Sequence, residues 1–189
     1  MNKILCFSLL FCSILSCQLG DTKNAYTISG TIDFMGTTEV NVHLLKGDEI
    51  IATTTSLEFT FENLEEGTNY TILPVSKDYE SGRNGISTLD LVEVGKYVDG
   101  LIEFDLFQRM AADVNKDNVI NSMDLDIMKD CILSSIKTFQ CPTYRFVSAE
   151  HDENSFAYVD QYRTGKLFSD HEITFLPIKL GDVNNTTHH

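Results

Sequence analysis

Basic residues are scarce in this chain. It carries 14 Lys and Arg against 28 Asp and Glu, so its formal net charge is −14 at pH 7. Binding to a nucleic-acid backbone requires patches of Lys and Arg, and the sequence has no such patch. We therefore expect no nucleic-acid partner. The excess of carboxylates instead favours a protein in which bound cations relieve the repulsion between them.

Known catalytic signatures are also missing. The sequence contains no G-x-S-x-G, no phosphate-binding P-loop and no H-E-x-x-H motif. Its five His residues show no metal-ligand spacing, and paired carboxylates carry little information in a chain this acidic. These absences predict a protein that is not an enzyme.

The apolar run near the N-terminus is too short to span a bilayer. It extends from Ile4 to Leu15 and follows a short basic start that contains Lys3, which is typical of an export signal. The sequence before Cys17 resembles a bacterial lipobox, so residues 1–17 are predicted to be a lipoprotein signal peptide with Cys17 as the lipidated residue. A simple secretory signal is the alternative. We expect an outer-membrane or cell-surface lipoprotein that meets the membrane only through its lipid, or alternatively a periplasmic or secreted protein.

The chain has only five Cys residues. Cys6 and Cys12 lie within the predicted signal, and Cys17 is the candidate for lipidation. Cys131 and Cys141 remain in a compartment that permits disulfides. A bridge across this short loop would contribute about 2–3 kcal/mol if its geometry is unstrained. The alternative is one buried helix Cys and one loop Cys.

Residues 113–124 are rich in side-chain oxygen. Asp or Asn occupies positions 1, 3, 5, 9 and 12 of this segment, and the backbone carbonyl at position 7 is also available. The twelve-residue loop that wraps Ca²⁺ has the same ligand spacing. The alternative is a solvated acidic turn that binds nothing. The predicted calcium ligands are Asp113, Asn115, Asp117, Val119, Asn121 and Asp124.

Two departures from the EF-hand pattern are informative. Position 6 is Asn118 instead of Gly, and Asn tolerates the positive φ that this turn requires. Position 12 is Asp124 instead of Glu, and residues 107–112 upstream could form only a short helix. The loop therefore resembles the type I dockerin family. That resemblance implies a duplicated calcium loop–helix unit in a non-catalytic module whose partners are cohesins.

The chain contains an internal repeat of the expected kind. Residues 86–98 align without gaps on residues 120–132, at an offset of 34. The front of the first loop is degraded, because Tyr79, Ser81 and Arg83 occupy its positions 1, 3 and 5. Either this half has lost its metal, or it takes oxygen ligands from elsewhere.

A candidate donor lies near the C-terminus. Residues 181–185 read like the opening of a second D-x-N loop that has no helix after it. If this segment folds back, Asp182 and Asn184 would join Asp90 in a second, weaker metal site. The alternative is an acidic tail with a chance D-x-N sequence.

Residues 26–76 have the alternation of apolar and polar residues, with turns between short segments, that predicts a small antiparallel β-sandwich. The pattern resembles the carboxypeptidase-regulatory-like and Cna-B-like sandwiches of bacterial surface proteins, which are mostly spacer modules. Residues 144–147 and 173–180 are candidate strands, and residues 150–170 read as a polar loop.

The expected fold class is α+β: a small antiparallel β-sandwich packed with a dockerin-like pair of calcium loop–helix units and a C-terminal β segment. The order of motifs resembles a sandwich–dockerin unit of exported Bacteroidetes-type proteins. The predicted divisions are a signal at 1–17, a tether at 18–25, a sandwich at 26–76, a dockerin-like domain at 77–137 and a closing segment at 138–189 with GDVN at 181–184.

These features favour an exported, calcium-binding interaction module associated with surface protein assembly or polysaccharide utilisation. Its partner would be a cohesin-like module or another surface protein. Loop positions 10 and 11 usually contribute to the cohesin-binding surface, and Thr88 and Ser122 fit the Ser/Thr preference there. Leu89 and Met123 depart from it and are expected to be buried.

Two alternative functions remain open. One is a calcium-stabilised structural spacer of a surface lipoprotein. The other is a small carbohydrate-binding lipoprotein, which would need Phe156, Tyr158 and Tyr162 as an exposed aromatic strip.

Overall fold

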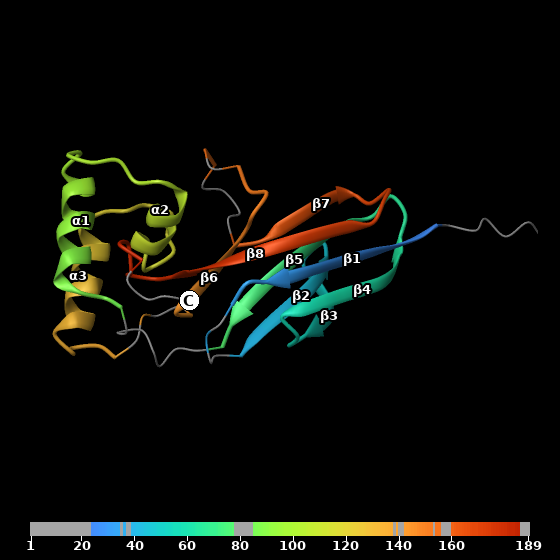
Figure 1. Ribbon diagram of the computed structural model, residues 1–189, viewed down its shortest axis with the longest axis horizontal. Coiled ribbons are helices and arrows are strands. Elements are labelled where there is room, and N and C mark those ends of the chain that lie inside the picture. The colour runs from blue at the N-terminus through green and yellow to red at the C-terminus, as the bar shows by residue number, and fades with distance from the viewer. Residues whose placement is uncertain are drawn as a thin grey trace, which may run out of the picture.

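The computed structural model describes residues 24–34, 36, 39–77, 85–137, 139, 142–152, 154–155 and 160–185. Within these residues the chain is α+β, with eight strands in two sheets and three helices (Figure 1). None of the described helices has the length and apolar character needed to cross a membrane. The predicted signal and lipidation site, residues 1–17, lie outside the described part of the chain.

Each sheet has four strands, and both combine strands from the two ends of the sequence. The first sheet has the order β4–β1–β8–β6 and the second has the order β3–β2–β5–β7. The strands are β1 (Ala25–Ile32), β2 (Val40–Lys46), β3 (Glu49–Thr54), β4 (Glu58–Glu65), β5 (Asn69–Ser76), β6 (Tyr144–Ser148), β7 (Tyr162–Lys166) and β8 (His171–Lys179).

The strands within residues 26–76 pair antiparallel, as predicted, but the sheet that contains β1 also has a parallel pair that the sequence did not predict. β8 lies between β1 and β6 and runs parallel to β1, with Gly30 opposite Ile173. An added Cβ at Gly30 would lie 2.3 Å from the carbonyl oxygen of Ile173, so only glycine allows the two strands to approach this closely. The local alternation of residues 26–76 could not reveal a partner strand more than 140 residues away.

The reading of residues 150–170 as a loop is wrong for the part that forms β7. β7 pairs antiparallel with β5 at the edge of the second sheet. Its sequence, Tyr162–Lys166, is mostly polar and half-buried or exposed, so it lacks the apolar alternation that marks a strand. Pairing with β5 and burial of the next residue, Leu167, hold it in place.

Both sheets contribute side chains to one hydrophobic core. In β2, Val40, Val42 and Leu44 are buried at alternate positions, as a strand with one buried face requires. Ile28 of β1 and Phe175 of β8 are fully buried in the same cluster. The sheets therefore depend on residues 144–179 as well as on residues 26–76.

The helices form the other end of the molecule. They are α1 (Thr88–Val98), α2 (Leu106–Ala112) and α3 (Ser122–Ile132), and a second core lies among them. α1 and α3 have equal lengths and an offset of 34 residues, which matches the sequence repeat. Each begins with a capping box, from Ser87 with Asp90 in α1 and from Asn121 with Asp124 in α3.

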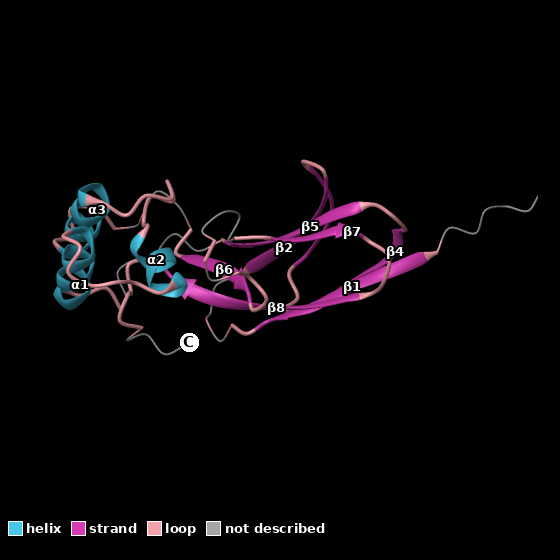
Figure 2. Cartoon of the chain, turned by 90° about the horizontal axis from the view of Figure 1, so that it is seen from above, coloured by secondary structure: helices cyan, strands magenta, loops and turns pink. Residues whose placement is uncertain are grey.

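Two strands contribute side chains both to the core of the sheets and to the core among the helices. In β6, Phe146 belongs to the sheet core and its neighbour Val147 belongs to the helical core. β8 does the same with Phe175 and Ile178. The molecule is elongated, and β1 begins at the end of the sheets farthest from the helices (Figures 1 and 2).

Candidate metal centre

The segment 113–124 is a tight loop between two helices. Asp113 is the C-cap of α2, and Asn121 is the N-cap of α3. Lys116 and Asn118 have positive φ values of 61° and 66°, so the chain turns sharply at loop positions 4 and 6. The expectation that Asn118 accepts the left-handed conformation is confirmed.

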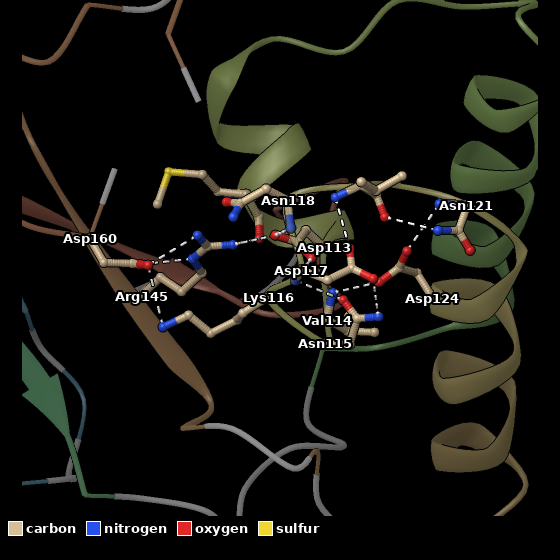
Figure 3. A network of polar contacts seen from close by, with 12 residues as sticks. Asp113, Val114, Asn115, Lys116, Asp117, Asn118, Asn121, Asp124, Arg145 and Asp160 are labelled. Carbon is tan, nitrogen blue, oxygen red and sulfur yellow. Dashed lines mark hydrogen bonds and ion pairs between the residues drawn. The ribbon is translucent and has the colours of Figure 1, made fainter. Parts of the chain in front are cut away.

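Two carboxylates of the loop are fully buried. Asp113 and Asp124 both have an exposed fraction of 0%. Asp124 accepts hydrogen bonds from the backbone N–H of Val114 (3.1 Å) and of Asn121 (3.0 Å). Asp113 accepts from the backbone N–H of Asp117 (3.0 Å) and of Asn118 (3.2 Å), so both side chains are fixed by the turns of the loop (Figure 3).

The surroundings of Asp124 disfavour its charge. Burial raises the pKa of this carboxyl above its ordinary value, and the negative charges of Asp113 and Asp117 raise it further, although the backbone hydrogen bond from Asn121 opposes the shift. A buried carboxylate beside two others is costly unless a positive charge offsets it. This environment suits a divalent cation.

The remaining predicted ligands lie in the same loop. Asn115 Oδ1 accepts from the N–H of Asp117 (3.0 Å), and Asp117 Oδ1 accepts from the N–H of Val119 (2.8 Å). The Val119 carbonyl accepts from the side-chain amide of Asn121 (3.2 Å). These carboxylate, amide and carbonyl oxygens are the ligand types that Ca²⁺ takes.

Acidic side chains alone do not make the site. Among the described residues, no three His, Cys, Asp or Glu side chains are placed so that they could hold a metal ion. A calcium loop also draws on amide and backbone carbonyl oxygens. The donor chemistry of the loop therefore fits calcium, provided that Asn115, Asn121 and the Val119 carbonyl contribute.

Sequence reasoning missed a buried cation beside this loop. Arg145 of β6 is 2% exposed, and its Nη1 donates to Asp113 Oδ2 at 3.1 Å. Burial lowers the pKa of the guanidinium, but the hydrogen bond and charge of Asp160 and the charge of Asp113 outweigh this effect, so the net pKa is raised. No local signal marks Arg145, because it lies 32 residues beyond Asp113 and only the docking of β6 brings it there.

The second predicted site gathers residues from both halves of the chain. Asp90 is fully buried at the start of α1, where its Oδ2 accepts from the N–H and the hydroxyl of Ser87, both at 2.8 Å. Its Oδ1 accepts from the backbone N–H of Asn184 at 3.2 Å. Asp182 is 6% exposed and precedes Asn184 in the same turn. The C-terminal segment therefore folds back onto the first helix of the repeat.

This tail has features of the opening of the loop 113–124. Val183 and Val114, which follow the two Asp residues, are both buried. Asn185 and Lys116, three residues after those Asp residues, both have positive φ values, 52° and 61°. In each case a backbone N–H of this opening donates to the Asp of the capping box.

The side chain of Asn184 is unusual. Its Nδ2 and Oδ1 atoms are buried and have no hydrogen-bond partner within the described part of the protein. A buried amide without partners costs free energy, so the position favours an additional ligand. The sequence repeat predicts that the front of the loop before α1 consists of Tyr79, Ser81 and Arg83. These three residues lie outside the described part of the chain.

The two helix starts present exposed side chains. Thr88 and Ser122 are exposed, as a partner-binding surface requires. The expectation that Leu89 and Met123 are buried is wrong, because they are 55% and 58% exposed. Both lie in the first turns of their helices, where the capping Asp at the next position points inward and leaves the preceding apolar side chain in solvent.

Comparison with known proteins agrees with this geometry. Residues 83–133 match the family model of the dockerin type I domain. The match contains α1, α2, the loop 113–124 and α3, and it supports a dockerin domain at the helical end. No curated protein and no solved structure matches the chain. Dockerin domains are non-catalytic interaction modules that typically bind calcium, and they are typically extracellular or at the cell surface.

Other predicted features fall largely outside the described residues. Cys131 is buried on α3, but Cys141 lies beyond the described part, so their disulfide stays a prediction. Phe156 and Tyr158 are likewise not described. Tyr162 packs beside the sheet core, and its hydroxyl lies 3.3 Å from His171 Nδ1.

Proposed function

We propose that this protein is an exported, non-catalytic interaction module that uses calcium to order its dockerin domain. The observation that carries the proposal is the pair of fully buried carboxylates, Asp113 and Asp124, at the two ends of one turn-rich loop. Asp113, Asn115, Asp117, Val119, Asn121 and Asp124 would hold the ion. Bound Ca²⁺ would supply the positive charge that offsets the burial of these carboxylates.

We also propose a second, weaker calcium site at Asp90, Asp182 and Asn184. The contact of Asn184 with Asp90 supports it, as does the buried side-chain amide of Asn184, which has no hydrogen-bond partner among the described residues. The site would be closed by the tail of the chain because the front half of the first loop lacks suitable ligands. Metal binding there would tie the C-terminal segment to the first helix of the repeat.

Calorimetric titration of residues 18–189 with Ca²⁺ tests both sites. The expected result is two binding events, of which Asp113→Ala removes the tighter and Asp182→Ala the weaker. One event, lost only in Asp113→Ala, would contradict the second site. No binding by the unmodified protein would contradict the calcium proposal itself.

The proposed partner is a cohesin-like module or another surface protein, in surface protein assembly or polysaccharide utilisation. The exposed pairs Thr88–Leu89 and Ser122–Met123 at the two helix starts support a docking surface. Val92 is also 51% exposed on α1. An apolar surface of this kind on a dockerin domain favours an adaptor over a purely structural spacer.

A cohesin module provides the test of this surface. Leu89→Lys should weaken calcium-dependent binding at least about tenfold, because a charge replaces an apolar contact at a desolvated interface. The matched control is Ile50→Lys on β3, which is similarly exposed at 52% and lies in the sheet region. Equal binding by both variants would contradict a docking surface at the helix starts. The absence of any calcium-dependent complex would favour the spacer.

The carbohydrate-binding alternative has less support. Tyr162 is the only member of the proposed aromatic strip among the described residues, and it is half-buried beside the sheet core. The lipid anchor at Cys17 remains part of the proposal, and it would place the chain at the outer membrane or cell surface. Because β1 begins at the end of the sheets away from the helices, an anchor before it would leave the dockerin domain facing outward.

A further inference from the structure

The loop 113–124 is joined to the sheets through a network of ion pairs centred on the buried Arg145. Arg145 donates from Nε and Nη2 to the two carboxylate oxygens of Asp160, at 2.8 and 3.1 Å. Its Nη1 donates to Asp113 Oδ2 at 3.1 Å and to the Met110 carbonyl at 3.4 Å. Lys116, at loop position 4, forms an ion pair with Asp160 at 3.3 Å, so the loop contacts the network at two points (Figure 3).

Two members of this network, Arg145 and Asp160, lie outside the dockerin match. Arg145 belongs to β6 and is paired with Ile178 of β8, while Asp160 comes shortly before β7. The side chains of Arg145 and Asp113 are 1% and 0% exposed. Water screens a buried pair of this kind poorly, so each charge acts strongly on its neighbour.

The guanidinium leaves Asp113 able to bind a metal. A carboxylate oxygen has two lone pairs. Asp113 Oδ2 accepts from both Arg145 and the N–H of Asn118, whereas Oδ1 accepts one hydrogen bond among the described residues, from the N–H of Asp117. Calcium can therefore coordinate Oδ1 while Arg145 stays on Oδ2. The guanidinium and the ion would share one carboxylate.

We propose that Arg145 is the positioning residue and counter-charge of the calcium loop, and that Asp160 moderates its charge. This inference rests on the proposed calcium function. Without metal, Arg145 offsets the repulsion among Asp113, Asp117 and Asp124 and keeps the position 1 carboxylate in place. With metal bound, the same positive charge opposes the ion and lowers the affinity of the loop. The sheet region thereby sets how strongly the dockerin domain depends on calcium.

The test uses two substitutions with opposite expected effects. Arg145→Met removes the positive charge while keeping most of the side-chain volume, and it should tighten calcium binding by on the order of tenfold. It should also lower the melting temperature in EDTA by on the order of 10 °C, because Asp113 is left buried without its partner. Asp160→Asn removes the moderating negative charge and should weaken calcium binding several-fold. Calorimetric titration and thermal melts in calcium and in EDTA measure both effects.

The two variants are expected to change the calcium affinity in opposite directions, which a purely structural role of the network would not produce. If the network only packs β6 against α2, both variants would lower the melting temperature equally with and without calcium, and neither would change the affinity. That result would overturn the inference, as would weaker binding by Arg145→Met. If Arg145→Met does not fold, the partly exposed Asp160→Asn decides alone, and unchanged or tighter binding would overturn the inference. An unmodified protein that binds no calcium would instead contradict the proposed function, on which this inference depends.

Discussion

Removal of calcium should lower the melting temperature of residues 18–189 by about 5–15 °C. A ligand at 100 to 1,000 times its Kd stabilises the folded state by about 2.7–4.1 kcal/mol, and 1 kcal/mol shifts the melting temperature of a domain of this size by about 2–4 °C. Asp113→Ala should melt at a similarly low temperature without a chelator, because it removes the buried ligand at loop position 1. Thermal melts with calcium and with EDTA measure the difference.

The control for this prediction is Asp126→Ala. Asp126 is exposed on α3, two residues after the last predicted ligand. The melting temperature of the Asp126→Ala variant should therefore fall in EDTA as much as that of the unmodified protein. A melting temperature that does not respond to EDTA in the unmodified protein would contradict the calcium site.

The same experiment has an expected dependence on pH. The pKa of Asp124 is raised in the metal-free protein, so its ionised form destabilises the fold above that pKa, and this penalty is relieved as the pH falls through it. Calcium binds the ionised form and offsets the penalty. The gap between the melting temperatures in calcium and in EDTA should therefore be widest near neutral pH and should close on acidification. A constant gap would argue against Asp124 as a ligand.

Phe175→Ala should destabilise the protein by about 3–5 kcal/mol. Phe175 is fully buried on β8 in the core that both sheets share, and its removal leaves a cavity between strands from opposite ends of the sequence. We expect a fall in melting temperature of about 6–20 °C on the same scale. Denaturant unfolding of the variant and the unmodified protein measures the change in free energy.

The matched control is Phe168→Ala. Phe168 has the same side chain and lies in the same C-terminal segment, but it is 59% exposed. Its substitution should change the free energy of unfolding by no more than about 0.5 kcal/mol. Equal effects of the two substitutions would mean that β8 is not part of the sheet core.

Local pattern was sufficient for the elements that carry their own signals. The repeat offset of 34 residues predicted two equivalent helices, and α1 and α3 have that offset. The spacing of Asp and Asn predicted a turn-rich loop at 113–124, and Asn118 adopts the left-handed conformation that its position requires. Both features depend on residues a few positions apart, so they can be predicted from one sequence without knowledge of the tertiary structure.

Exposure and long-range pairing were not available from the sequence. Leu89 and Met123 read as core residues because they are apolar, yet their direction follows from the capping Asp beside each of them. β7 was read as a loop because its strand conformation depends on pairing with β5. The parallel pairing of β1 with β8 depends on Gly30, whose role appears only when Ile173 lies against it.

The sequence by itself determined the chemistry of this protein: an acidic chain, a loop with calcium-type ligands and a duplicated helix. Tertiary structure decided what surrounds that chemistry. It brought Asn184 to Asp90 and Arg145 to Asp113 across separations of 94 and 32 residues. The physical reason is that ligand types and turns are properties of short segments, whereas a buried charge finds its partner only where the packing of distant strands and helices excludes water.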